Sequence, residues 1–153
     1  MSKGNTFEND LLLLIFNNTN IANIGDATGL RGSSSPGLLY VSLHTSPGPD
    51  EGGDQATNEV TTTAYQGYAR KSMNRDNTSA GWTVSGNSVS PAANIDFPAC
   101  TGGTGATITH FAIGTTGGTA AGKVLYKGAV SPNITVTNGV TPRLTTATAI
   151  TED

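Results

Sequence analysis

The stretch LLYVSLHTSPG, residues 38–48, decides the fold class. Its side chains alternate in character: Leu39, Val41 and Leu43 on one face, and Tyr40, Ser42 and His44 on the other. Successive side chains of a β-strand point to opposite faces of a sheet, so this period of two predicts a strand. The following Ser-Pro-Gly predicts a sharp turn, so that His44 lies at the end of the strand.

The same signals recur along the rest of the chain. Segment 81–90 reads as a hairpin with Gly86 and Asn87 at its turn. Turn residues separate the strand candidates at intervals of about 8–12 residues, which is typical of an antiparallel sandwich. We therefore predict a mainly β fold, an antiparallel β-sandwich or jelly-roll-like domain, with a closed barrel as the alternative. The further candidate strands are 64–73, 94–99, 107–116, 123–130, 133–137 and 144–153.

One short N-terminal helix is expected before the strands. Asn5 and Glu8 have the spacing of a capping box, and Asn17 marks the expected end of the helix. Seven apolar side chains form one wide face of this helix: Phe7, Leu11, Leu14 and Ile15, broadened by Leu12, Leu13 and Phe16. Such a wide apolar face must be covered, either by the same domain or by a neighbouring subunit. The candidate contact residues on this face are Phe7, Leu11, Leu14 and Ile15.

The pattern divides the chain into three parts. We expect an N-terminal helical segment at 1–24, a Gly/Ser/Pro linker at 25–37 and the β-sandwich domain at 38–153. Segment 46–64 is long, acidic and rich in turn formers, which predicts an exposed loop.

Composition excludes several classes of protein. The 153 residues carry a net charge of −3 and 12% charged residues, which argues against a partner that is a nucleic acid. Cys100 is the single cysteine, so neither an internal disulfide nor a cysteine metal site is expected. The apolar run 11–16 is too short to span a bilayer. We expect synthesis in a cytoplasm and no membrane partner.

The chemistry-bearing residues predict no catalytic, cofactor or metal site. His44 shares a strand face with Ser42, but neighbours two apart on a strand stand side by side. His44 is therefore interpreted as a strand-end residue that bonds the turn backbone. The acidic run near Asp50 lacks the alternating pattern of a calcium loop. No Gly-x-Ser-x-Gly elbow is present. The protein is not expected to be an enzyme.

The segment GGTAAGKV, residues 117–124, has the spacing of a phosphate-binding loop as far as Lys123. The next residue is Val124, whereas such a loop needs Ser or Thr there to hold magnesium. The segment also leads into a strand candidate and not a helix. We interpret it as a Gly-rich turn between two strands.

Several longer segments together resemble a family of tailed-bacteriophage structural proteins, whose members are described as tail fibre or capsid decoration (cement) proteins. The resemblance covers nearly the whole chain and implies a virion component without catalysis. The segments that carry it, in order, are NTFENDLLLLIFNNTNIANIGD, LYVSLHTSPGP, QGYARKSM, GWTVSGNSVSPAANIDFPACTGG, THFAIGT and GVTPRLTTATAITED.

The resemblance leaves the place in the virion open. The first expectation is a capsid decoration protein on the outside of the head, bound to the major capsid protein or other virion proteins. It would form a homo-oligomer, with a trimer favoured because capsid lattices offer three-fold sites. The alternatives are a tail-fibre or tail-tip component and a host-surface carbohydrate-binding module. Fold alone does not separate these functions.

Overall fold

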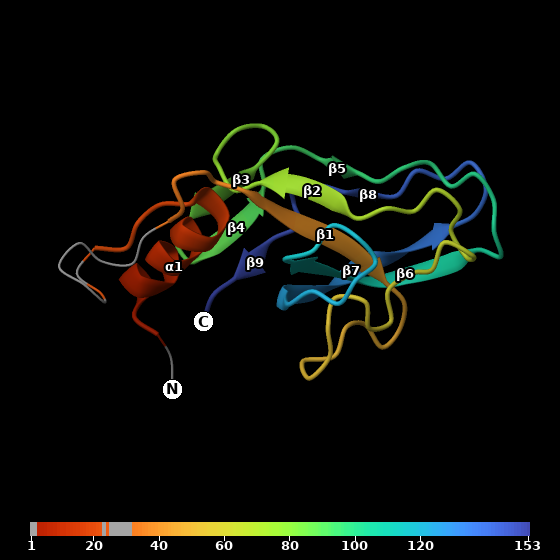
Figure 1. The fold of residues 1–153 in the computed structure, drawn as a ribbon, viewed down its shortest axis with the longest axis horizontal. Coiled ribbons are helices and arrows are strands. Elements are labelled where there is room, and N and C mark those ends of the chain that lie inside the picture. The colour runs from red at the N-terminus through yellow and green to blue at the C-terminus, as the bar shows by residue number, and fades with distance from the viewer. Residues whose placement is uncertain (1–2, 23, 25–31) are drawn as a thin grey trace. The chain divides into compact units, whose positions relative to one another are not determined.

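A computed structural model describes residues 3–22, 24 and 32–153. Within these residues, one helix, α1 (Asn5–Asn17), precedes nine strands (Figure 1). This confirms the predicted mainly β fold with one N-terminal helix. The strands are β1 (Leu38–His44), β2 (Lys71–Asn74), β3 (Trp82–Ser85), β4 (Ser88–Pro91), β5 (Ile95–Asp96), β6 (Ala106–Gly114), β7 (Val124–Val136), β8 (Arg143–Leu144) and β9 (Ile150–Thr151).

The strands form three sheets with open strand orders, β2-β1-β6-β7, β3-β4-β9 and β5-β8. The described sheets do not close on themselves, so the barrel alternative is not found. β1 pairs antiparallel with β6, from Tyr40 opposite Gly114 to His44 opposite His110. β6 also pairs antiparallel with β7. Because β1 lies between β2 and β6, the strand predicted at the start of residues 38–48 is an inner strand of the largest sheet.

The chain divides into two compact units that are discontinuous in sequence. The first comprises residues 1–38, 73–94 and 144–153, and the second comprises residues 39–72 and 95–143. The sequence-based division into helix, linker and sandwich stays a prediction. Of the expected linker, residues 25–31 lie outside the described part of the chain.

The start of α1 differs by one residue from the predicted capping box. Gly4, and not Asn5, is the N-cap, with extended dihedral angles of φ −77° and ψ 139°. The Gly4 carbonyl accepts the Glu8 amide at 3.0 Å, which brings Asn5 into the first turn. A helix that starts one residue earlier leaves the Asn5 side chain in the wrong position to cap it.

The end of α1 agrees with the prediction. Asn18 adopts the left-handed conformation, and its amide donates to the Leu13 carbonyl, as in a common C-terminal cap. The guanidinium of Arg75 donates to the carbonyls of Leu14 and Ile15, each at 2.7 Å. A distant arginine thus satisfies carbonyls of the last turn and places positive charge at the negative end of the helix dipole.

The first unit is built on the packing of α1 against the β3–β4 hairpin, whose turn at Gly86-Asn87 is as predicted. Leu12 and Phe16 of α1 are fully buried. The Phe16 ring meets the Trp82 ring edge to face, with centroids 4.9 Å apart and an interplanar angle of 69°. Such aromatic pairs add about 0.5–1.5 kcal/mol to the free energy of area burial.

The second unit contains the β1–β6 core, in which Leu39, Val41 and Leu43 are buried as their alternation predicted. Several strand predictions were wrong in extent. Segment 94–99 is a strand only at β5, and segment 144–153 contributes to two short strands, β8 and β9. In segment 64–73 only the end joins β2, because the Thr61 carbonyl accepts the amides of both Ala64 and Tyr65 and closes a turn. The two strands predicted at 123–130 and 133–137 form one strand, β7, with an irregularity in its register.

Candidate functional site

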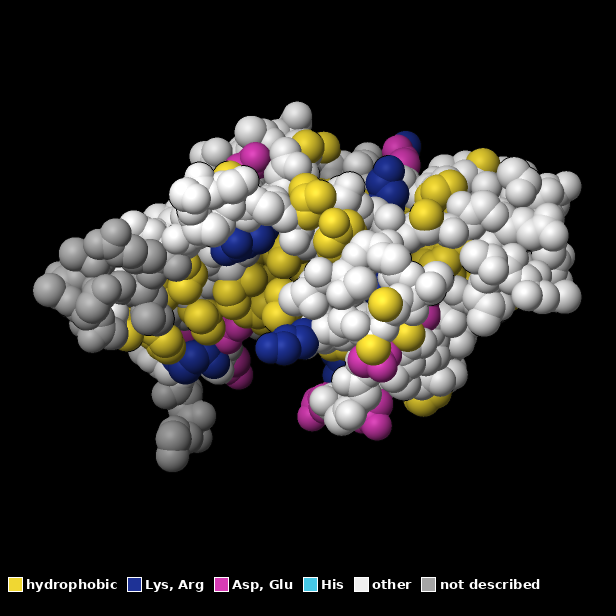
Figure 2. Space-filling view, viewed as in Figure 1, with side chains coloured by type: hydrophobic (Ala, Val, Ile, Leu, Met, Phe, Trp, Pro, Cys, Tyr) yellow, Lys and Arg dark blue, Asp and Glu magenta, His cyan; other side chains and the backbone are white. Residues whose placement is uncertain are grey.

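The predicted contact residues of α1 lie outside its most buried stripe. That stripe consists of Glu8, Leu12 and Phe16, spaced four apart along the helix. Phe7 is 37% exposed, and the other three predicted residues are half-buried: Leu11, Leu14 and Ile15. Hydrophobic side chains are visible over α1 in the space-filling view (Figure 2).

His44 is fully buried and holds neighbouring backbone, as predicted. Its Nδ1 atom lies 3.0 Å from the Thr57 carbonyl oxygen, and its Nε2 atom lies 2.8 Å from Ser42 Oγ. A carbonyl only accepts, so Nδ1 carries the proton and Nε2 accepts the Ser42 hydroxyl. Burial lowers the pKa of His44, which keeps the ring neutral. Nδ1 thus fixes the loop after β1, whereas Nε2 bonds a neighbour within β1. The expectation that Ser42 and His44 only stand side by side was wrong, because their side chains meet in this hydrogen bond.

Gln55 is the second anchor of that loop and is also fully buried. Its Nε2 donates to the Tyr40 carbonyl at 2.9 Å and to Ser42 Oγ at 3.3 Å. Its backbone amide donates to the Gly122 carbonyl at 2.8 Å. Most of segment 46–64 is exposed, as predicted, but Gln55 and Val60 tie it to the sheet.

Of the acidic residues of this loop, Asp50 and Glu51 are exposed, and Asp54 and Glu59 are half-buried. In the space-filling view, acidic side chains gather on one region of the surface (Figure 2). In the described residues no group of three or more His, Cys, Asp or Glu side chains is arranged to hold a metal ion. No described helix is long and apolar enough to cross a membrane.

The Gly-rich segment that mimics a phosphate-binding loop joins β6 to β7. The Thr115 amide donates to the Lys123 carbonyl at 3.2 Å, which draws the two ends of the segment together. The interpretation as a turn between two strands is confirmed.

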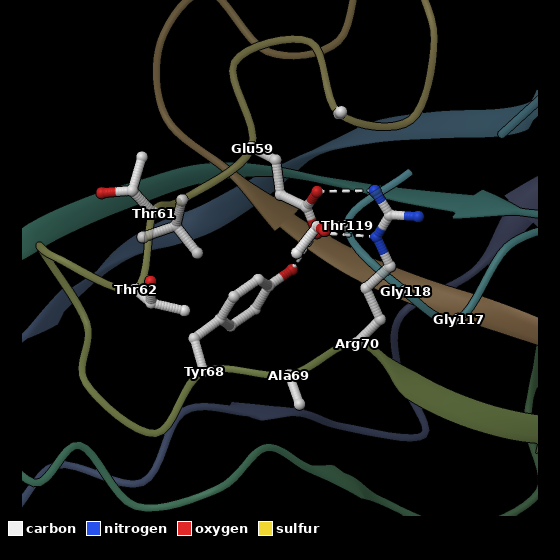
Figure 3. A pocket seen from close by; sticks show the side chains of 11 residues that line it. Glu59, Thr61, Thr62, Tyr68, Ala69, Arg70, Gly117, Gly118 and Thr119 are labelled. Carbon is white, nitrogen blue, oxygen red and sulfur yellow. Dashed lines mark hydrogen bonds and ion pairs between the residues drawn. The ribbon is translucent and has the colours of Figure 1, made fainter. Parts of the chain in front are cut away.

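A pocket of about 460 Å³ opens in the second unit beside this turn (Figure 3). Its walls come from three segments: the end of the loop after β1, the extended stretch before β2 and the turn between β6 and β7. Val60 and Arg70 are its buried lining residues, Glu59 and Tyr68 are half-buried, and the others are exposed. The lining residues are 56, 59–62, 68–70 and 117–119.

An ion pair between Glu59 and Arg70 forms one wall of the pocket. Arg70 Nε lies 2.8 Å from Glu59 Oε1, and the second nitrogen lies 2.6 Å from Oε2, so the contact is bidentate. The exposed fractions of the two side chains are 2% for Arg70 and 10% for Glu59. The hydrogen bonds to Glu59 raise the pKa of Arg70 further above its already high value.

Tyr68 completes this polar cluster. Its hydroxyl donates to Glu59 Oε1 at 2.6 Å and accepts the Leu43 amide at 3.0 Å. Burial, reinforced by the neighbouring Glu59 carboxylate, raises the pKa of Tyr68, so its phenol stays protonated. Arg70 also donates to the Thr116 carbonyl at 2.7 Å, which links the pair to the third wall of the pocket.

Sequence reasoning missed this cluster. Glu59 was grouped with the exposed acidic loop, and Arg70 was part of a strand candidate. One local signal was available: Tyr68 and Arg70 are two residues apart, so in an extended segment they share a face. The contacts of Arg70 with Glu59 and Thr116 depend on the tertiary structure, and the contact with Thr116 joins residues 46 positions apart in the sequence.

The mainly β fold and the virion resemblance define a class, that of phage structural proteins, and a comparison with protein families supports it. Residues 3–151 match the model of the family described as podophage GP4 fiber I protein gp80. The match covers nearly the whole chain, and the protein belongs to this family. Among curated proteins no match was found.

The family confirms the resemblance to phage virion structural proteins and changes the expected place. A fibre family favours the tail-fibre alternative over the capsid decoration role that was expected first. The expectation of decoration came from the short chain and the apolar helix. Neither feature distinguishes head from tail, because an apolar face drives association with any complementary surface.

Proposed function

We propose that the protein is a structural component of a podophage tail fibre, assembled with other virion proteins. The observation that carries the proposal is the match of residues 3–151 to a family of podophage fibre proteins. The polar groups found inside the fold serve structure in this proposal. Both ring nitrogens of His44, for example, bond loop and strand atoms. No catalytic role is proposed.

Immunogold labelling of intact virions tests this location. Antibodies raised against the purified protein should place gold particles at the tail of the phage that encodes it. Gold spread over the head would support capsid decoration and contradict the proposal. Label on neither head nor tail, with the protein present only in infected cells, would contradict a virion role altogether.

We also propose that the partly exposed face of α1 contacts a second copy of the chain in a homo-oligomer. The support is its composition: Phe7, Leu11, Leu14 and Ile15 remain at least partly accessible beside the buried stripe. Full burial of one such side chain is worth about 1.5–3 kcal/mol. A few of them, repeated by symmetry, offset the entropy lost on association.

Light scattering tests the oligomer. The wild-type chain should have the mass of an oligomer, and the Leu11→Asp/Leu14→Asp variant should be a folded monomer. Both side chains are only half-buried, so the variant is expected to keep its circular dichroism spectrum. A monomeric wild type would contradict the proposal, as would a double variant that stays oligomeric.

A further inference from the structure

The pocket beside the Glu59–Arg70 pair has the dimensions of a small-molecule site. Its volume of about 460 Å³ falls within the range of about 300–1,000 Å³ that is typical of ligand pockets. Ligand pockets are commonly apolar with a few fixed polar groups. Here Val60 and Ala69 provide apolar surface, and Glu59, Tyr68 and Arg70 provide the polar groups.

The walls of the pocket are held in place before any ligand arrives. Arg70 bonds Glu59 on one side and, at 2.7 and 3.3 Å, the carbonyls of Thr116 and Ala120 on the other. A single buried guanidinium therefore connects all three segments that form the pocket. A site that is ordered in the free protein loses less entropy on binding, which raises affinity for a ligand that fits.

The charge of the pocket selects against ionic ligands. Glu59 and Arg70 are the charged residues among those that line it, and they neutralise each other through a bidentate contact. An anion or a cation would lose hydration in the pocket and meet no uncompensated opposite charge there. The site therefore favours an uncharged ligand.

The remaining lining is amphipathic in a way that matches a hydroxylated ring. Thr61, Thr62 and Thr119 each offer a methyl group and a hydroxyl that both donates and accepts hydrogen bonds. The Tyr68 ring lies between the threonine pair and the ion pair (Figure 3). A sugar ring presents C–H groups to such apolar and aromatic surface, and its hydroxyls meet the polar groups between them.

We propose that this pocket binds an uncharged sugar residue of a polysaccharide. The binding itself follows from the pocket. Only its use, to hold a glycan of the host surface, rests on the proposed fibre function. The two claims fail separately, because immunogold labelling reports location and a solution assay with the isolated protein reports sugar binding.

The structure offers a matched pair of glycines for the test. A Cβ atom added at Gly118, which lines the pocket, meets no atom within 4 Å. The same holds at Gly52, an exposed position of the loop after β1 that does not line the pocket. Neither glycine has a left-handed φ, so Gly118→Phe and Gly52→Phe are both expected to fold.

Saturation-transfer NMR with the purified full chain is the assay. The probes are the methyl glycosides of glucose, galactose, mannose, rhamnose and N-acetylglucosamine, with methyl glucuronide as the charged counterpart of methyl glucoside. We expect at least one neutral glycoside to receive saturation from wild type. Its binding should weaken about tenfold or more in Gly118→Phe and stay unchanged in Gly52→Phe.

Three results would overturn the inference. The first is that no neutral glycoside binds the wild-type chain. The second is binding that Gly118→Phe leaves intact, which would place the sugar elsewhere. The third is stronger binding of methyl glucuronide than of methyl glucoside, which would show that the ion pair does not make the site neutral.

Discussion

Replacing Arg70 with methionine removes the positive half of the buried ion pair and keeps much of the side-chain volume. Glu59 would then hold a carboxylate that is only 10% exposed, with the Tyr68 hydroxyl as its remaining recorded donor. The Thr116 carbonyl would also lose its 2.7 Å hydrogen bond. Removal of one partner of a buried pair costs about 3–5 kcal/mol, because the other charge stays uncompensated.

The control for this prediction is the exposed pair between Arg143 and Asp96. It is also bidentate, at 2.5 and 3.0 Å, but its side chains are 53% and 47% exposed. Solvent screens an exposed pair, so Arg143→Met should destabilise the protein far less than Arg70→Met. The same substitution thus separates the effect of burial from the effect of losing an arginine.

A second substitution tests whether the uncompensated carboxylate causes the loss of stability. Glu59→Gln on the Arg70→Met background removes the uncompensated carboxylate and leaves an amide oxygen that can accept the Tyr68 hydroxyl. The double variant should therefore be more stable than Arg70→Met alone. Urea denaturation followed by circular dichroism measures each free energy of unfolding. Equal losses for Arg70→Met and Arg143→Met would refute the reasoning.

Three further predictions concern the loop and the helix. The pKa of His44 is lower in the folded chain than its ordinary value of 6.5, so the unfolded chain binds the proton more tightly. His44 should therefore lower the free energy of unfolding as the pH falls below 6.5. Urea denaturation at several pH values should show that the free energy of unfolding depends less on pH in His44→Gln than in His110→Gln. Gln55→Ala removes a fully buried anchor, so a glutamate-specific protease should cut after Glu51 faster than in wild type, as followed by mass spectrometry; an unchanged rate would mean that Gln55 does not hold the loop. Leu12→Ala should cost about 2–5 kcal/mol in urea denaturation and Leu11→Ala clearly less, because Leu12 is fully buried and Leu11 is not; the opposite order would contradict the packing of α1.

The features that sequence analysis predicted well depend on neighbours in the chain. β1 follows from the alternation of Leu39, Val41 and Leu43, and the β3–β4 hairpin follows from Gly86-Asn87. The end of α1 at Asn17 follows from a residue that tolerates the left-handed conformation at position 18. Each signal lies within a few residues of the structure that it specifies.

The features that sequence analysis missed depend on contacts between residues far apart in the chain. Tyr65 and Tyr68 suggested a strand, but the hydrogen bonds of Gln66 to Gly102 and of Thr101 to Gln66 hold this segment against another loop. The pocket likewise brings residues 59–62, 68–70 and 117–119 together. Periodicity carries no information about such pairings, because the distance along the chain does not determine the distance in space.

The central claim, that the protein belongs to the tail fibre, is tested most directly by separating tails from heads. Purified virions of the encoding phage can be disrupted and fractionated, and the protein quantified by mass spectrometry in each fraction. The account predicts that it copurifies with tails, in an amount that scales with the number of fibres and not with the major capsid protein. Recovery with DNA-filled heads, in proportion to the major capsid protein, would contradict it.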